Sequence, residues 1–173
     1  GIYEFNVGDS RWEVLRKLTL GQQKLLPITI IEGSTFRHIT KTIQNSAFLR
    51  EDIFDKDLPS KILSFETLGV EGLFFPDTYY YKSDTSSSEI LLLALKKMES
   101  VLNSEWKKRS KSISFVIKTP YDALILASIV EREAVLDAEK PIIAGVFINR
   151  LLKNMRLQSD PTVIYAMGDD YKG

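Results

Sequence analysis

The stretch DTSSSEILLLALKKMESVLNSEWKKRSKS, residues 84–112, limits the possible folds more than any other part of the chain. Ser86 and Glu89 have the spacing of a capping box, in which two side chains satisfy exposed N–H groups at the start of a helix. Basic residues crowd the far end, where they complement the negative end of the helix dipole. The stretch therefore predicts one long helix over about residues 87–109.

Further helix starts follow in the second half of the chain. Thr119 precedes a proline at the first helical position of PYDALILASIVEREAV, which predicts a helix there. Asp137 is expected to cap the next helix, which runs to about Asn154, and Asp160 is expected to cap a short last one. The second half is therefore expected to be mainly helical.

The N-terminal part combines strand and helix patterns. GIYEF resembles a short strand, a capping-box spacing begins at Ser10, and Gly21 suits the left-handed end of the helix between them. LLPITIIEG alternates like a strand, and Ser34 is expected to cap a second helix. The predicted fold class is therefore α+β, with a small α+β subdomain over residues 1–45 and a mainly helical part over residues 46–173.

The composition excludes several kinds of site. The chain has no cysteine and 1 histidine, which excludes disulfides, thiolate zinc sites, cysteine nucleophiles and multi-histidine metal sites. That histidine, His38, has basic neighbours and is expected at the surface. Lys plus Arg balance Asp plus Glu at 23 each, so the net charge gives no argument for a nucleic-acid partner. No run approaches the ~20 apolar residues of a membrane-spanning helix and no signal peptide is visible, so the chain is expected to be a soluble piece of something longer.

LASIVEREAV, residues 126–135, places Glu131 and Glu133 in a segment that looks built for burial. On a helical wheel, apolar residues occupy nearly every sector, and the neighbours of Glu131 are Leu124, Ala127 and Val135. Acidic side chains are rarely buried unless they pair with an opposite charge or take part in the protein's function. A structural carboxylate would need a partner, for which the candidates are Arg132, Arg150 and Arg156. The wheel does not choose between a structural and a functional carboxylate.

A buried glutamic acid would suit general acid catalysis, because aliphatic surroundings disfavour its charged form and leave it a proton to donate to a glycosidic oxygen. Glu133, two positions along the helix from Glu131, points to a different face and is not expected to reach the same bond. Sugar-compatible side chains gather over residues 71–81 and 156–162, and Glu131 is expected to face a groove shared with both segments. The candidate sugar-contacting residues are Glu71, Phe75, Asp77, Tyr79, Ser128, Asn149, Arg150, Gln158, Ser159, Asp160 and Thr162.

EGLFFPDTYYY, LASIVEREA and AGVFINRLLKNMRLQSDPTVIYAMG occur in this order, and together they resemble the YceG-like family of endolytic murein transglycosylases. The strongest part of the resemblance spans residues 120–168, and the N-terminal segment resembles the family's LysM-like subdomain. The catalytic glutamate of the family's SIVE motif falls on Glu131. Ala134 departs from the threonine that the family more often has there, and the family continues past this chain's last residue.

The resemblance implies a lytic murein transglycosylase, a carbon–oxygen lyase that cuts the glycan strands of nascent peptidoglycan. Glu131 would protonate the glycosidic oxygen between N-acetylmuramic acid and N-acetylglucosamine. It would then take the proton from the muramic C6 hydroxyl, which leaves a 1,6-anhydro end. The reaction needs no metal and no cofactor. The resemblance also implies a place at the extracytoplasmic face of the bacterial cytoplasmic membrane, held by an N-terminal anchor outside this chain, with peptidoglycan synthases as possible partners.

Two alternatives stay open. The first is a glycan-binding or scaffold module without catalysis, in which Glu131 is a structural carboxylate. The second is a pyridoxal-phosphate enzyme similar to aminodeoxychorismate lyase, which needs a Schiff-base lysine in a phosphate-binding site. The sequence disfavours the second, because it has no Gly-rich phosphate loop and its lysines fall on predicted exposed helix faces.

Overall fold

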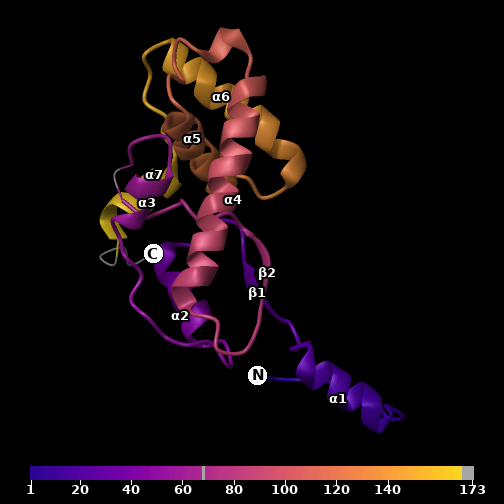
Figure 1. The fold of residues 1–173 in the computed structure, drawn as a ribbon. Coiled ribbons are helices and arrows are strands. Elements are labelled where there is room, and N and C mark those ends of the chain that lie inside the picture. Colours follow the sequence, from indigo (N-terminus) through magenta and orange to yellow (C-terminus); the bar gives the residue numbers. More distant parts are fainter. Residues whose placement is uncertain (68, 169–173) are drawn as a thin grey trace. The chain divides into compact units, whose positions relative to one another are not determined.

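The structure is a computed structural model that describes residues 1–67 and 69–168 (Figure 1). The helices are α1 (Arg11–Thr19), α2 (Phe36–Gln44), α3 (Leu58–Ile62), α4 (Ser87–Lys108), α5 (Pro120–Glu133), α6 (Lys140–Leu152) and α7 (Asp160–Met167). Two short 3-10 turns are η1 (Lys111–Ile113) and η2 (Asp137–Glu139), and the strands are β1 (Leu26–Ile30) and β2 (Asp77–Tyr81). The predicted α+β class is therefore confirmed.

The chain forms two compact units. The first comprises residues 1–62 and 69–98, and the second comprises the described residues of 63–68 and 99–173. Helix α4 runs without a break from the first unit into the second, so it is one of the covalent links between them.

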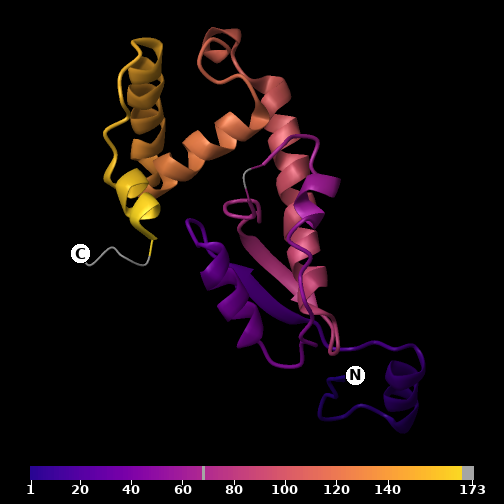
Figure 2. The ribbon, with the colours of Figure 1, turned by 90° about the vertical axis from the view of Figure 1, so that its left-hand side faces the viewer.

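The first unit is built on a two-stranded antiparallel sheet in which Leu26 pairs with Tyr81 and Ile30 with Asp77. Along each strand, alternate side chains face opposite sides of the sheet. Ile28 and its cross-strand partner Tyr79 are buried on one face. Figure 2 shows α2 and the first half of α4 beside this sheet, and both helices contribute buried side chains to the unit.

The core of the first unit is completed by aromatic rings and by one face of α4. The rings of Phe36 and Phe74 lie 5.3 Å apart, and Phe54 meets Phe74 edge-on at 5.7 Å. The buried residues of α4 are Ile90, Leu91, Ala94, Leu95 and Met98. Their spacing of three and four residues places them on a single face of the helix, which is the face that packs into this unit.

Three predicted capping sites are confirmed. Ser10 forms a capping box with Glu13, and Thr119 forms one with Asp122 at the start of α5. The Ser86 hydroxyl accepts from the Glu89 N–H at 3.3 Å, at the start of α4. These motifs are local, so side-chain spacing alone is sufficient to predict them.

Three other predicted caps are wrong. Thr35 rather than Ser34 caps α2. Asp137 begins the turn η2 and pairs with Lys140 instead of capping α6. Asp160 is the first residue of α7, and the preceding Ser159 makes no cap because its hydroxyl donates to Glu133.

The predicted strand at GIYEF is also wrong, because residues 1–6 form no regular element. The strand that pairs with β1 is β2. The two strands are far apart in the sequence, so a local pattern does not reveal that they pair. The predicted boundary at residue 45 falls between these two paired strands. The two compact units follow strand pairing and helix packing, and the division at residue 45 with its LysM-like N-terminal part stays a prediction.

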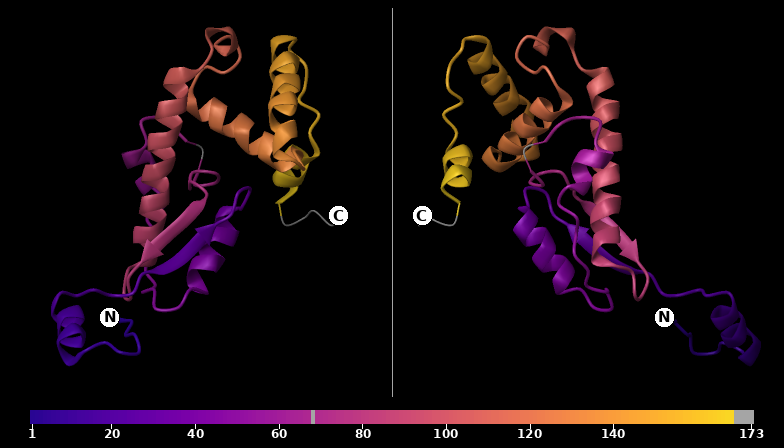
Figure 3. Two further views of the ribbon diagram at one scale, coloured as in Figure 1. Left: turned by 90° about the vertical axis from the view of Figure 1, so that its right-hand side faces the viewer. Right: turned by 60° about the vertical axis from the view of Figure 1, so that its left-hand side comes forward.

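The second unit contains α5, α6 and α7, whose arrangement two further views make clear (Figure 3). Val130 of α5 and Phe147 of α6 are its buried apolar residues on these helices. The expectation that the α5 helix is buried on most sides is wrong, because Val130 is the only residue of α5 that is buried, and Val135, just beyond the helix, is 88% exposed. Among the described residues, none of the helices has the length and hydropathy needed to cross a membrane.

A first prediction concerns the apolar face of α4. Leu95 is fully buried, and its truncation in Leu95→Ala leaves a cavity, so the variant should lose about 2–5 kcal/mol of unfolding free energy. Leu93→Ala, on the exposed side of the same helix, is the matched control and should cost less than about 1 kcal/mol. Urea denaturation of both variants measures the difference, and equal losses would contradict the packing described here.

A second prediction concerns the start of α4, where Asp52 accepts hydrogen bonds from the Ser87 hydroxyl at 2.5 Å and the Ser88 N–H at 2.8 Å. Burial opposes ionisation of this carboxyl, but the serine hydrogen bonds outweigh it and lower the pKa of Asp52 to about 2. Asp52→Asn should therefore cost about 1 kcal/mol at neutral pH, a modest value because the site is exposed.

The pH dependence gives the Asp52 prediction a sign. A lowered pKa stabilises the folded state above the pKa of the unfolded chain, about 4, and the benefit is lost as the pH falls toward about 2. The stability difference between wild type and Asp52→Asn, measured by urea denaturation, should shrink over that interval. Asp57→Asn, a substitution of an exposed carboxylate nearby, should show no such convergence, and a constant difference for Asp52→Asn would contradict the prediction.

Candidate functional site

Glu131 lies in the last turn of α5, and its carboxylate is paired. Its Oε2 atom is 2.7 Å from the Nζ atom of Lys140, the first residue of α6, and both side chains are 32% exposed. The interpretation of Glu131 as a buried acid among aliphatic side chains is therefore wrong. The partner comes from the next helix, across a turn whose geometry a helical wheel does not include.

Lys140 contacts a second carboxylate as well. Its ammonium lies 2.8 Å from Oδ1 of Asp137, whose side chain is almost fully exposed. The carboxylates of Asp137 and Glu131 raise the pKa of Lys140, and Lys140 in turn lowers the pKa of Asp137. Lys140 is therefore a stable cation between two acidic groups.

The turn that presents Lys140 is held by its own hydrogen bonds. The carboxylate of Glu139 accepts from the N–H groups of Val135 and Leu136 at 3.2 and 3.1 Å. Helix α5 ends where the Ala134 N–H donates to the Val130 carbonyl at 2.9 Å. These contacts fix the direction in which the chain enters α6. They therefore also fix the backbone position of Lys140, the first residue of that helix.

Glu133 has a different partner, as its spacing from Glu131 predicted. Its Oε2 atom accepts from the hydroxyl of Ser159 at 2.8 Å, and Ser159 is one of the most buried polar residues of the unit. The arginine partners considered for a structural carboxylate are not the ones observed: Glu131 pairs with Lys140, Glu133 contacts Ser159, and Arg150 donates to the carbonyl of Leu157. The two carboxylates thus serve different contacts.

Seven of the predicted sugar-contacting residues share the second unit with Glu131: Ser128, Asn149, Arg150, Gln158, Ser159, Asp160 and Thr162. Two of them hold the local backbone in place through side-chain hydrogen bonds. Ser128 donates to the Ile125 carbonyl at 2.7 Å, and Thr162 donates to the Ser159 carbonyl at 2.6 Å. Asn149, Gln158 and Asp160 are exposed, so their polar groups are accessible to a ligand.

The other four, Glu71, Phe75, Asp77 and Tyr79, belong to the first unit, where each has an internal role. Glu71 accepts from the Phe36 N–H at 2.8 Å, at the start of α2. Asp77 pairs with Lys97, whose ammonium also lies 5.3 Å from the centre of the Phe75 ring. The Tyr79 hydroxyl donates to the Phe75 carbonyl at 2.6 Å, and burial raises the pKa of Tyr79 to about 12. Their place beside Glu131 stays a prediction.

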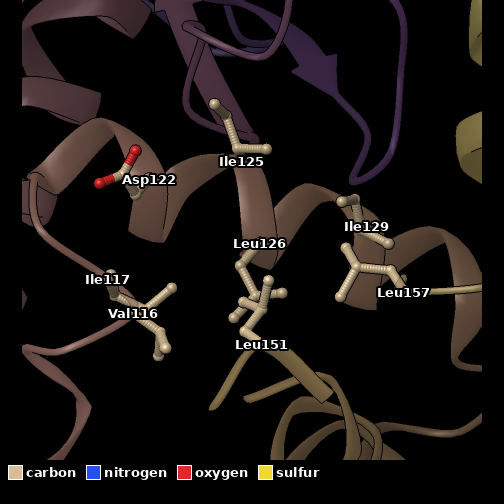
Figure 4. Close-up of a pocket in the computed structure, with 8 residues that line it drawn as sticks. All are labelled: Val116, Ile117, Asp122, Ile125, Leu126, Ile129, Leu151 and Leu157. Carbon is tan, nitrogen blue, oxygen red and sulfur yellow. The ribbon is translucent and has the colours of Figure 1, made fainter. Parts of the chain in front are cut away.

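A hollow of about 200 Å³ in the second unit is lined almost wholly by apolar side chains (Figure 4). Its lining residues are Val116, Ile117, Asp122, Ile125, Leu126, Ile129, Leu151 and Leu157. The one carboxylate among them, Asp122, accepts from the Thr119 N–H at 2.8 Å as part of the α5 cap. The hollow therefore offers apolar surface rather than an acid, and Glu131 is not part of its lining.

The described residues also bear on metal binding. Within residues 1–67 and 69–168, no three side chains of His, Cys, Asp or Glu are placed to hold a metal ion. His38 lies exposed on α2, near the capping Thr35, as expected from its basic neighbours.

The sequence interpretation did not identify Lys140 or Asp137 as part of the Glu131 environment. The available signal was weak, because an ion pair across a turn between two helices has no fixed periodicity. A basic residue at the start of a helix, where the dipole disfavours it, was the one local anomaly.

Comparison with known proteins places the chain in a family. The model of the YceG-like family matches residues 1–173. An endolytic murein transglycosylase of Bacillus subtilis (strain 168) is 32% identical over 191 residues, covering 97% of this chain and 51% of the relative. A Streptococcus pneumoniae (strain R6) protein of the same name is 27% identical over 201 residues, covering 97% of this chain and 35% of the relative.

A solved structure agrees with the sequence relatives. A crystal structure of a YceG-like protein from Listeria monocytogenes matches with a TM-score of 0.61 and 25% identity, covering 99% of this chain and 62% of that one. The chain spans about half the length of the Bacillus relative. On the full-length match to the family model, supported by these relatives and by the fold, the chain belongs to the YceG-like family.

Proposed function

We propose that the protein is a peptidoglycan lytic transglycosylase that cuts glycan strands internally. Membership of the YceG-like family and the name of its relatives, endolytic murein transglycosylase, support this activity. The observation that carries the proposal is the position of Glu131, at the end of α5 with about a third of its side chain exposed, in the SIVE segment. A carboxyl group in that position can both exchange a proton and reach a large substrate.

In the proposed reaction Glu131 acts alone. As an acid it gives its proton to the glycosidic oxygen between N-acetylmuramic acid and N-acetylglucosamine, and the bond from that oxygen to the muramic C1 breaks. As a base it then takes the proton of the muramic C6 hydroxyl, whose oxygen bonds to C1. One bond forms as one breaks, the proton is returned, and no water is consumed, so the product carries a 1,6-anhydro end.

The contacts of Glu133 support a single-carboxylate mechanism. Glu133 is held by the Ser159 hydroxyl at 2.8 Å, whereas Glu131 contacts Lys140. Glycosidases that use two carboxylates direct both at one bond. The different partners of these two side chains favour a reaction in which the substrate's own hydroxyl replaces the second carboxylate.

The substrate contacts are part of the same proposal. Exposed polar groups of Asn149, Gln158 and Asp160 lie in the same unit as Glu131 and suit hydroxyl and amide groups of a sugar. Residues 1–45 are proposed as a LysM-like subdomain. Glu71, Phe75, Asp77 and Tyr79 of the first unit are proposed to lie beside the glycan. We further propose that the protein acts at the extracytoplasmic face of the cytoplasmic membrane, near peptidoglycan synthases.

A glycan-binding module without catalysis is the second candidate. The ion pair between Glu131 and Lys140 favours it, because a paired carboxylate at a helix end is also what a purely structural role would require. The two candidates differ in turnover, since only the enzyme shortens glycan strands.

The decisive comparison is Glu131→Gln against Glu133→Gln. Glutamine keeps the shape and the hydrogen-bonding capacity of Glu131 but has no proton to give, so cleavage of purified glycan strands should slow by at least about 10²- to 10⁴-fold. Glu133→Gln keeps an acceptor for Ser159 and should slow cleavage far less. Mass spectrometry of the wild-type products should show 1,6-anhydro ends, lighter by one water than hydrolysed ends.

Each result has a clear reading. Circular dichroism and thermal melting must show that both variants fold like the wild type. An active Glu131→Gln protein would exclude Glu131 as the acid, and reducing-end products would indicate a hydrolase with a second carboxylate. Tight glycan binding without turnover by the wild type would favour the binding module.

A further inference from the structure

The turn between α5 and α6 brings three charged side chains together. The Lys140 ammonium lies 2.7 Å from Glu131 and 2.8 Å from Asp137, so one cation is shared by two carboxylates. The Glu139 carboxylate is occupied by the backbone of the same turn. The arrangement is therefore specific: Glu131 contacts the cation, and Asp137 is a second, exposed partner for it.

The shared cation has a predictable effect on a carboxyl group. An opposite charge within hydrogen-bonding distance favours the ionised form of the carboxyl. Two carboxylates that share one cation each receive less of that stabilisation than one alone, because each also repels the other. About two thirds of the Glu131 and Lys140 side chains are covered, so solvent weakens the attraction without removing it.

We propose that Lys140 is a positioning residue for Glu131, holding its carboxylate in place and favouring its ionised form, and that Asp137 tempers this effect by competing for the same ammonium. The inference rests on the proposed function, because it assigns Lys140 a part in the work of Glu131. Lys140 itself transfers no proton: its pKa is raised by Asp137 and Glu131, so it stays charged throughout the reaction.

The proposal gives Lys140 opposite effects on the two steps of the reaction. The first step needs Glu131 protonated, and Lys140 opposes that form. The second step needs Glu131 ionised, and Lys140 favours it. When Glu131 is protonated, Asp137 remains the ion-pair partner of the Lys140 ammonium, so the cation is not left unpaired.

The other charged groups near the turn are already engaged or exposed. Glu133, on the same helix as Glu131, contacts Ser159 of the segment before α7. Glu139 of η2 contacts two backbone N–H groups, and Arg132 of α5 forms no ion pair with Glu131 or Asp137, whose cation is Lys140. Lys140 and Asp137 are therefore the groups whose removal should change the protonation of Glu131.

The test compares the pH dependence of glycan cleavage in the purified wild-type protein and single variants. Lys140→Met removes the cation, so the alkaline limb of the rate profile should move up by about 0.5 to 1 pH unit, while the maximal rate falls because the carboxylate is less well held. Asp137→Asn leaves the cation to Glu131 alone, so the limb should move down. Lys140→Arg should restore a profile close to that of the wild type.

Lys153→Met is the matched control, since Lys153 is an exposed lysine at the other end of α6. It should leave the profile unchanged. A merely structural role for Lys140 would lower the melting temperature and the rate at every pH without moving the limb. That result, or shifts of the same sign in Lys140→Met and Asp137→Asn, would overturn the proposal.

A second measurement separates this inference from the proposed function. The carboxyl carbon signal of Glu131, assigned by its loss in Glu131→Gln, can be followed by NMR during a pH titration of ¹³C-glutamate-labelled protein. Its midpoint should rise in Lys140→Met and fall in Asp137→Asn. These shifts in a protein that does not cleave glycan would reject the proposed activity while supporting the coupling, whereas unchanged midpoints would reject the coupling whatever the activity.

Discussion

The packing of α4 is the constraint on which the rest of the structure depends. One face of its first half, with Leu95 at its centre, fills the core of the first unit beside the paired strands. Its start is fixed by Ser86 and by Asp52, which satisfy N–H groups that would otherwise lack partners at a helix terminus. The helix then continues into the second unit.

In the second unit, the surroundings of Glu131 are set by the turn between α5 and α6 rather than by the apolar hollow. Its apolar hollow contains a carboxylate that only caps a helix, whereas Glu131 lies outside it and meets Lys140 across a turn. The electrostatic character of Glu131 is therefore set by charged neighbours and partial exposure rather than by burial in an aliphatic pocket. This changes the physical account of the proposed acid, although not its identity.

A paired acid and a catalytic acid are compatible. A carboxyl group that must give a proton and then recover one benefits from an environment that does not strongly favour either form. A cation shared with an exposed Asp137 is a weaker and more adjustable partner than a fully buried one. The same exposure leaves room for a polymeric substrate to approach.

The sequence by itself determined the local features of this protein. The capping boxes at Ser10 and Thr119, the bounds of α4 and the different faces of Glu131 and Glu133 follow from spacing along the chain, since each depends on residues within one or two helical turns. The family was also recognisable from three motifs, including the SIVE segment that contains Glu131.

Only the tertiary structure decided which distant residues meet. The pairing of β1 with β2, the contact of Ser159 with Glu133 and the ion pair of Glu131 with Lys140 each join segments that no periodic pattern connects. A helical wheel represents one helix in isolation, so it made Glu131 appear surrounded by aliphatic side chains. The charge that faces it arrives from another helix, because the hydrogen bonds of Glu139 set the turn between them.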